Sequence, residues 1–319
     1  MRVGWLVPCL GEFGGIRSIF ETGNCITDLG HEFFAITEHQ NRYYPPWIEY
    51  RGKMIDLENA KKIQFDIIFN QDPHCDGWET GIPTKLKALH ICSGYLHCCN
   101  HMMDKYDFIT TAFTRGYNHV HQNSEKEIIF TGQGINHNQF YFSDKRPENR
   151  NVFFCSRAFN VDNDQKGSIT TYNLMKPHMS KYNVFCWDNT TDSMPPGTNF
   201  IHCNYMVNRY SYANDIYHKA DVLLTLDRVS AWNCIAGEAM ACGTPVISTS
   251  EGMEDIGIAG YNYVLLEEYT SDAIETCIDS LINDEKYRKY IVTNAHNTIQ
   301  KFTWKKAAQR LISATEKRL

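Results

Sequence analysis

The chain has 319 residues, more than one hydrophobic core usually serves, so we expect two domains of about 150 residues each. Hydrophobic residues make up 43% of the chain, enough to fill two cores. Lys and Arg number 31 against 37 Asp and Glu, which gives a net charge of −6 and no general basic field to hold nucleic acid.

The opening apolar run, residues 1–8, is too short for a signal peptide, and no segment reaches the roughly eighteen apolar residues that span a bilayer. We therefore expect a cytoplasmic protein without a transmembrane segment, in which any membrane contact is peripheral. The twelve cysteines are scattered along a core-forming chain, so we expect them to be reduced.

Short β-rich runs alternate with helical patterns, which is typical of parallel sheets covered by helices. In the first half the predicted strands are residues 2–8, 32–37, 66–69, 87–91, 107–111 and 127–131. Residues 132–150 then break the alternation, because they are rich in Gly, Asn and charge and contain Pro147. This composition is typical of a linker between domains.

Strand-like runs resume in the second half at residues 151–155, 183–187, 199–202, 221–225, 244–248 and 263–266. Helical patterns lie near residues 167–176, 209–219, 233–242 and 271–283, and continue almost unbroken from 284 to 319. We predict two doubly wound α/β domains over 1–148 and 149–300, followed by a helix over 301–319.

The first predicted strand leads to Gly11, Gly14 and Gly15, and a helical pattern begins at Ile16. Adjacent glycines let a backbone approach a ligand closely, and the N-terminus of a helix attracts anions. The spacing differs from GxGxxG, which argues against a dinucleotide site. A tight turn without a ligand is the alternative.

A second candidate site follows the strand at residues 151–155, where Ser156-Arg157 is followed nine residues later by Lys166-Gly167 and a helical pattern. Arg pairs with phosphate oxygens through its planar fork, and Lys supplies a mobile point charge. Together they suit a diphosphate. Two solvated surface cations are the alternative.

The strongest local pattern is the small-residue helix Ala236–Cys242, which ends at Gly243 before a β-branched strand. Glu238 lies in its middle, where a buried carboxylate needs a partner. A ligand hydroxyl would satisfy it. A solvated glutamate on the helix surface is the alternative.

Residues 221–256 resemble the donor-binding region of glycosyltransferase family 4, whose members usually read close to E-G-F-G-x-x-x-x-E-A-M-A-C-G-x-P-V. Further similar stretches follow in the family's order: Gly14-Gly15-Ile16-Arg17, Thr131 to Asn136 with Phe140, Ser156-Arg157 with Lys166-Gly167, and Phe302-Thr303-Trp304. The resemblance implies the GT-B fold, in which two Rossmann-like domains face a central cleft. The N-terminal domain would take the acceptor and the C-terminal domain the donor, and the last helix would cross back to the N-terminal domain.

The resemblance further implies a retaining hexosyltransferase that moves a sugar from a nucleotide sugar to a glycan, lipid or other acceptor, without a metal or other cofactor. Arg157 and Lys166 would act on the diphosphate, and Glu238 would bind the ribose hydroxyls. The full set of implied donor-binding residues is Gly14, Gly15, Ser156, Asp227, Ser230, Glu238, Gly252 and Met253.

The sequence departs from the family at Ser230, where members usually carry a first glutamate. A serine does not offer the same pair of acceptor oxygens to sugar hydroxyls, and Asp227 is the candidate substitute. For this reason a GT-B protein that binds nucleotide sugar without transfer stays open as a second function. Among enzymes, a nucleotide-sugar epimerase is the other alternative, although the match to E-A-M-A-C-G-x-P-V favours a transferase.

Histidines complete the list of candidates. The family tends to place a sugar-contacting histidine in the N-terminal domain, and the candidates here are His90 and His97. We take His90, at the end of a predicted strand, as the catalytic candidate; a core histidine is the alternative. His97, Cys98, Cys99 and His101 lack a C-x-x-C pair, so we predict no metal site there.

Overall fold

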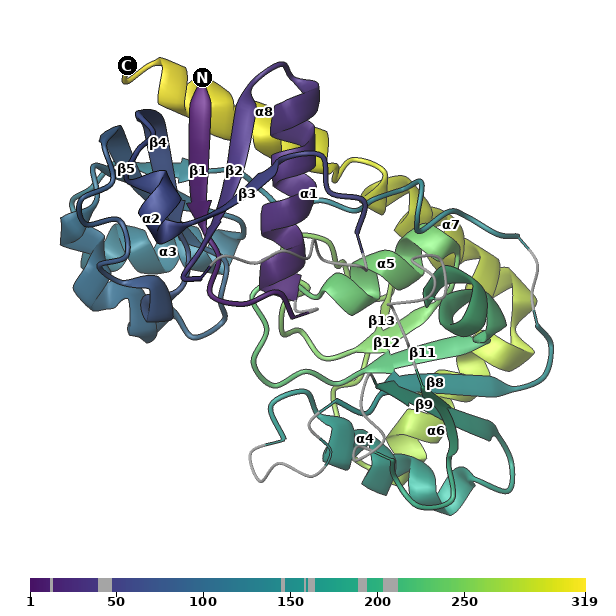
Figure 1. Cartoon of the computed structure of the whole chain (residues 1–319). Helices are drawn as coiled ribbons and strands as arrows, with labels where there is room; N and C mark the ends of the chain where they lie inside the picture. The colour runs from purple at the N-terminus through teal and green to yellow at the C-terminus, as the bar shows by residue number, and fades with distance from the viewer. Residues whose placement is uncertain are drawn as a thin grey trace. The chain divides into compact units, whose positions relative to one another are not determined.

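The computed structural model describes residues 1–11, 14–39, 48–144, 147–157, 159, 164–188, 194–202 and 212–319. The chain divides into two compact units, one formed by Met1–Gly134 with Phe302–Leu319 and the other by Ile135–Lys301 (Figure 1). Each unit contains one parallel sheet with helices packed on it. The prediction of two doubly wound α/β domains is confirmed.

The N-terminal unit has a seven-stranded sheet in the order β3-β2-β1-β4-β5-β6-β7. Its strands are β1 (Arg2–Leu6), β2 (Glu32–Thr37), β3 (Lys53–Asp56), β4 (Phe65–Asn70), β5 (Thr84–Ile91), β6 (Phe108–Thr111) and β7 (Ile128–Phe130). The sequence did not predict β3, because this edge strand has four residues, none of them fully buried. At the centre of the sheet Trp5 stacks on Phe69 with ring centroids 4.8 Å apart.

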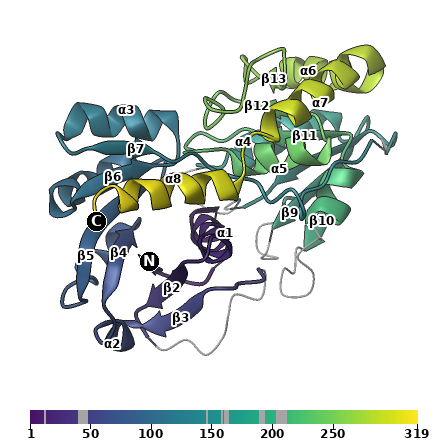
Figure 2. The ribbon, with the colours of Figure 1, turned by 90° about the horizontal axis from the view of Figure 1, so that it is seen from above.

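Its helices are α1 (Gly14–Asp28), α2 (Leu57–Ala60), α3 (Thr114–Asn123) and α8 (Trp304–Glu316), with 3₁₀ segments at Pro73–Cys75 and Leu96–Lys105. The last helix packs against α1 and crosses it (Figure 2). Thr303 caps α8 by accepting a hydrogen bond from the Lys306 backbone N–H, and Leu311 lies on its buried face. The C-terminal helix is therefore part of the N-terminal unit.

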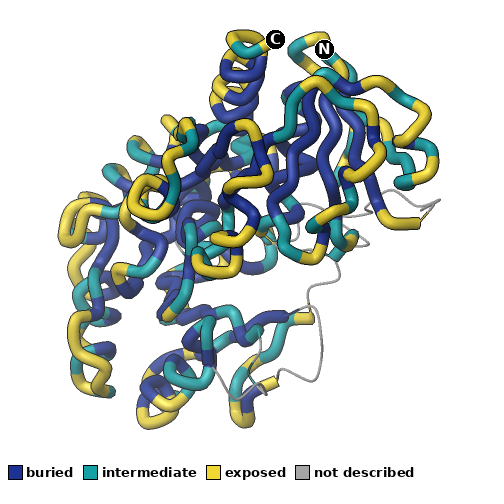
Figure 3. The backbone as a smooth tube through the Cα atoms, turned by 90° about the vertical axis from the view of Figure 1, so that its left-hand side faces the viewer, coloured by how far each residue is buried: buried dark blue, intermediate teal, exposed yellow. Residues whose placement is uncertain are grey.

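The C-terminal unit has a six-stranded sheet in the order β10-β9-β8-β11-β12-β13. Its strands are β8 (Asn151–Cys155), β9 (Asn183–Asp188), β10 (Asn199–His202), β11 (Val222–Thr225), β12 (Val246–Ser248) and β13 (Val264–Leu265). Its helices are α4 (Ser168–Met175), α5 (Cys234–Cys242), α6 (Ser271–Asn283) and α7 (Glu285–Ile299). In both units the central strands are largely buried, and exposure concentrates at the edge strands, in loops and on outer helix faces (Figure 3).

One predicted domain boundary and one predicted helix differ from the structure. The division falls after Gly134 rather than at 148, because the segment that follows belongs to the C-terminal unit: the Ser143 N–H donates to the Cys242 carbonyl, and Phe140 packs on Tyr217. The predicted helix over 209–219 is not one α-helix. Its described part is a π turn at Tyr212–Ile216 followed by a 3₁₀ turn at Tyr217–Lys219, and residues 209–211 lie outside the described residues.

Candidate functional site

The strand order of each sheet has a switch point, where two neighbouring strands are followed along the chain by strands that are added in opposite directions across the sheet. In the C-terminal unit this point lies between β8 and β11, and in the N-terminal unit between β1 and β4. Because all strands are parallel, their carboxyl ends share one edge, and ligands of open α/β sheets bind at this edge near the switch point. The loops that follow these four strands carry most of the candidate residues.

Lys166 and Asp227 form an ion pair at the switch point of the C-terminal unit, with 2.9 Å between Lys166 Nζ and Asp227 Oδ2. The Asp227 side chain is 6% exposed and that of Lys166 is 37% exposed. The Lys166 cation is therefore accessible to solvent, while the carboxylate that holds it is buried. Burial lowers the pKa of Lys166, but the neighbouring Asp227 carboxylate outweighs it and raises that pKa. Lys166 is therefore held as a cation in a fixed position.

The loop that carries Lys166 fits closely against the end of β11. Gly167 has a φ of +64°, and a Cβ there would lie 2.0 Å from the Leu226 carbonyl oxygen. The Arg228 N–H donates to the Gln165 carbonyl, which ties the two loops together. Glycine is thus required beside Lys166 both for its backbone angle and for this close approach.

Ser230 packs closely against the backbone of Gly252. A Cβ on Gly252, whose φ is +73°, would be 2.8 Å from Ser230 Oγ, and the Gly252 carbonyl accepts a hydrogen bond from the Asn233 N–H. Burial raises the pKa of Asp227, and both the Lys166 cation and a hydrogen bond from Ser230 counter this. Asp227 is therefore shared between Lys166 and Ser230.

Met253, the neighbour of Gly252, is 1% exposed, and its N–H donates to the Ser250 carbonyl. This hydrogen bond closes the turn after β12. The structure thus places Gly252 and Met253 at the same sheet edge as Asp227 and Ser230, with Met253 facing the core.

Glu238 is buried in α5, and one of its hydrogen-bond partners is a tyrosine that was not among the predicted site residues. The Tyr217 hydroxyl donates to Glu238 Oε2 over 2.7 Å. Tyr217 is itself fully buried, with Phe140 and Trp187 packed on its ring. The need of a buried carboxylate for a donor is the signal that could have pointed to a nearby tyrosine.

Ser156 and Arg157 directly follow β8, and Ser156 contacts Trp187, which packs on Tyr217. Ser156 is fully buried, and its N–H and hydroxyl both donate to the Trp187 carbonyl, so its side chain serves the backbone. Arg157 is half-buried, and its carbonyl accepts a hydrogen bond from the Ser168 hydroxyl. Arg157 and Lys166 therefore stand on loops anchored to each other at the start of α4.

In the N-terminal unit, the described end of the glycine loop is Gly14 and Gly15, which begin α1. The Gly15 carbonyl accepts a hydrogen bond from Gln71 Nε2 over 2.8 Å, across the switch point. Gln71 is 6% exposed, and among the described residues its Oε1 has no hydrogen-bond partner. The sequence analysis missed Gln71, although a polar residue directly after a buried strand is a usable signal.

His90 lies inside the sheet of the N-terminal unit. It is 4% exposed, its Nδ1 is hydrogen-bonded to Thr110 Oγ1 over 2.8 Å, and its ring meets that of Trp5 edge-on. Burial lowers the pKa of His90 to about 4. These contacts agree with the core-histidine alternative, so we do not carry His90 into the proposed catalytic site.

The histidine and cysteine cluster of the 3₁₀ segment is spread over its surface and interior. His97, Cys98 and His101 are exposed whereas Cys99 is buried. Throughout the described ranges, no group of three or more His, Cys, Asp or Glu side chains is arranged to hold a metal ion. In the same part of the chain, no helix is long and apolar enough to cross a membrane.

Residues 202–298 match the family model described as glycosyl transferases group 1. An uncharacterized glycosyltransferase of Methanocaldococcus jannaschii is 36% identical over 89 residues, which are 28% of this chain and 25% of that protein. The match thus spans about a quarter of the length of the curated relative. Residues 202–298, which match the family model, contain Asp227, Ser230 and Glu238.

Solved structures are similar over the whole chain. Sucrose-phosphate synthase from Thermosynechococcus elongatus has a TM-score of 0.79 at 14% identity, over 99% of this chain and 98% of that one. HepE of Anabaena, in complex with UDP-glucose, has a TM-score of 0.77 at 13% identity, over 100% of both chains. This chain therefore has the two-domain GT-B fold, and its residues 202–298 are similar to the glycosyl transferases group 1 family.

Proposed function

We propose that this chain is a retaining glycosyltransferase that moves a hexose from a nucleotide sugar to a glycan, lipid or other acceptor. The observation that carries the proposal is the anchored Lys166 cation, held 2.9 Å from buried Asp227 at the switch point of the unit that contains residues 202–298. A donor diphosphate needs such a fixed positive charge. The bound UDP-glucose of HepE, a protein of the same fold, supports a nucleotide-sugar donor.

The chemistry follows from where charge develops. As the glycosidic bond breaks, negative charge grows on the leaving diphosphate, and fixed cations stabilise it more than they stabilise the intact donor. Lys166 and Arg157 supply these cations. Glu238, held by Tyr217, accepts hydrogen bonds from the ribose hydroxyls. In the N-terminal unit, the helix start at Gly14 and Gly15 is a separate place where an anion can bind.

Asp227 takes a different role from the one expected of a substitute glutamate. Its carboxylate already accepts hydrogen bonds from Lys166 and Ser230, so we infer that it positions the catalytic cation rather than the sugar hydroxyls. Ser230 is closely packed under Gly252, which indicates a site rebuilt around serine. Membership of family 4 and a cytoplasmic location remain our predictions.

We also propose that transfer needs no metal ion, since Lys166 and Arg157 supply the charge that a divalent cation would otherwise provide. Activity should persist in EDTA when it is followed by release of nucleoside diphosphate. Loss of activity in EDTA that Mn²⁺ restores would contradict this proposal.

A two-stage experiment separates the three candidate functions. A thermal-shift screen over nucleotide sugars identifies the donor, because a ligand at a hundred times its Kd stabilises by about 2.7 kcal/mol. Nucleoside diphosphate and glycosylated product are then measured by mass spectrometry with sugar and lipid acceptors. A transferase forms both, a binding protein forms neither, and an epimerase returns an isomer of the donor without releasing nucleoside diphosphate.

A further inference from the structure

The strand β7 forms an open edge of the N-terminal sheet. It pairs with β6, and no strand within the described ranges pairs with its other side. The Glu127 carbonyl and the Thr131 N–H both bond to β6. Because these directions alternate along a strand, the backbone groups of Ile128 and Phe130 point to the outer edge. An extended chain can form hydrogen bonds with this edge.

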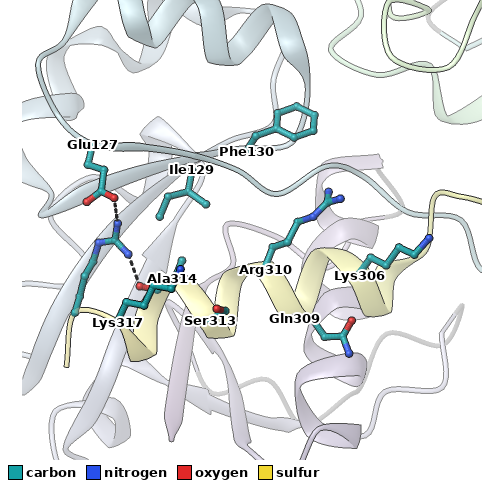
Figure 4. Close-up of a pocket in the computed structure, with 10 residues that line it drawn as sticks. Glu127, Ile129, Phe130, Lys306, Gln309, Arg310, Ser313, Ala314 and Lys317 are labelled. Atoms are coloured by element: carbon teal, nitrogen blue, oxygen red, sulfur yellow. Dashed lines mark hydrogen bonds and ion pairs between the residues drawn. The ribbon is translucent and has the colours of Figure 1, made fainter.

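A groove of about 410 Å³ lies between β7 and α8, and we name it the β7 groove (Figure 4). Ile129 points into it from the strand, and Lys306, Arg310 and Lys317 line it from the helix. The Arg310 Nη1 donates to the Thr131 carbonyl, which fixes the guanidinium at the end of β7. The groove is positively charged.

The charge balance of this groove is opposite to that of the whole chain. Among the described residues that line it, Lys306, Arg310, Lys317 and Arg318 are cations and Glu127 is a carboxylate, which is paired with Arg318. The chain carries a net charge of −6. A local excess of positive charge on an acidic protein favours an acidic partner at this place.

The opposite face of β7 has a smaller, apolar hollow of about 240 Å³. Thr114, Tyr117 and Phe130 line it, and Phe130 points away from α8 (Figure 4). Tyr117 is 36% exposed and Phe130 is 37% exposed, so both rings offer apolar surface beside the open strand. One face of the edge therefore suits acidic side chains and the other apolar ones.

We propose that β7 binds an extended segment of a partner protein, which adds a strand to the sheet. Side chains of a strand alternate between its faces, so this segment would carry acidic residues at every second position and apolar residues between them. The acidic residues would meet Lys306, Arg310 and Lys317, and the apolar residues Tyr117 and Phe130. A lipid surface would use the charge but not the directional backbone groups of the edge.

The test uses the full chain and a fluorescent hexapeptide of alternating glutamate and valine. The matched control is a peptide of the same composition with the glutamates first and the valines last, which cannot place all acids on one face. We expect the alternating peptide to bind about tenfold tighter, with an affinity that falls as salt rises. Methylating every second backbone nitrogen of the peptide should abolish this difference.

A protein variant tests the groove itself. Lys306→Glu with Lys317→Glu should weaken binding of the alternating peptide by about tenfold, as expected for two reversed surface charges. Lys286→Glu, on the exposed surface of α7, should leave it unchanged. Thermal melting of all variants checks that they are folded.

Four results would overturn the proposal. Equal binding of both peptides would show charge attraction alone. Displacement of the alternating peptide by phosphatidylserine vesicles, but not by unlabelled peptide, would show a membrane surface. Dimers that form with rising protein concentration and exclude the peptide would show a second copy of the chain, and failure to bind at millimolar peptide would show no site.

Discussion

The orientation of the buried Glu238 carboxylate depends on a hydrogen bond from Tyr217, a residue distant in sequence. Tyr217→Phe removes the donor to Glu238 but keeps the ring that packs on Phe140 and Trp187. We expect the affinity for nucleoside diphosphate to fall about fivefold, or ~1 kcal/mol, because the carboxylate loses its fixed orientation. Isothermal titration calorimetry measures this change.

A dideoxy nucleotide provides the control for this variant, since it lacks the ribose hydroxyls. Wild type and Tyr217→Phe should bind it equally. Equal loss of affinity for both nucleotides would show that Tyr217 supports the fold rather than the orientation of Glu238.

His90 predicts a pH dependence of stability. Burial lowers its pKa to about 4 in the folded protein, whereas an unfolded histidine has a pKa of about 6.5. Between these values the unfolded chain binds the extra proton, so stability is complete above pH 6.5 and falls as the pH drops, by ~3 kcal/mol in all. In His90→Gln, which retains a hydrogen-bonding group for Thr110, the thermal midpoint should fall less from pH 6.5 to 4.5. An unchanged pH profile would contradict this account.

At the residue scale, the sequence could identify positions that follow strands but not their partners. Lys166, Gly167 and Glu238 stand in recognisable local patterns. Tyr217 does not, because its hydrogen bond to Glu238 crosses 21 residues and a single tyrosine carries no periodicity that would single it out. Gln71 follows a predicted strand, but its partner Gly15 lies 56 residues away and is brought to it only when the sheet has formed.

The position of the loop before α4 depends on Gly167, whose backbone lies very close to the Leu226 carbonyl. Gly167→Ala would place a Cβ 2.0 Å from the Leu226 carbonyl, so the Lys166 loop must shift. We expect a loss of several kcal/mol of stability, more than the ~1 kcal/mol of positive φ alone. Chemical denaturation measures the difference.

The matched control is Gly30→Ala, since Gly30 has a φ of +87° with nothing within 4 Å of the added Cβ. It carries the strain of the backbone angle without the clash. Equal destabilisation by both substitutions would show that the approach to Leu226 has no energetic weight.

Strand existence was readable because buried parallel strands are short β-branched and aromatic runs between turn residues. Every strand predicted from the sequence corresponds to one in the structure, and the missed strand, β3, lies at an edge with little burial. The type of helix was harder to predict, because tertiary contacts decide whether a helical segment forms α, π or 3₁₀ turns. The segment Tyr212–Ile216 is a π turn that the helical pattern alone does not distinguish from an α-helix.

At the scale of the whole molecule, the chain returns to its first unit through α8. Leu311 is 2% exposed on the helix face that packs in the N-terminal unit. Leu311→Ala should destabilise that unit by about 2–5 kcal/mol. Hydrogen exchange should then show lower protection in α1 and α8, with α6 unchanged. The exposed Gln309→Ala on the same helix serves as control, and uniform loss of protection in both units would contradict the assignment of α8.

The most direct test of the account compares transfer with donor binding in wild type and Lys166→Ala. Nucleoside diphosphate release is measured under single turnover with the donor found by thermal shift, and donor affinity is measured in parallel. We expect wild type to transfer sugar and Lys166→Ala to be slower by about a hundredfold, since a fixed charge acts mainly on the transition state. Donor affinity should change much less. A wild type that binds donors but transfers sugar to no acceptor, or a Lys166→Ala variant with an unchanged rate, would contradict it.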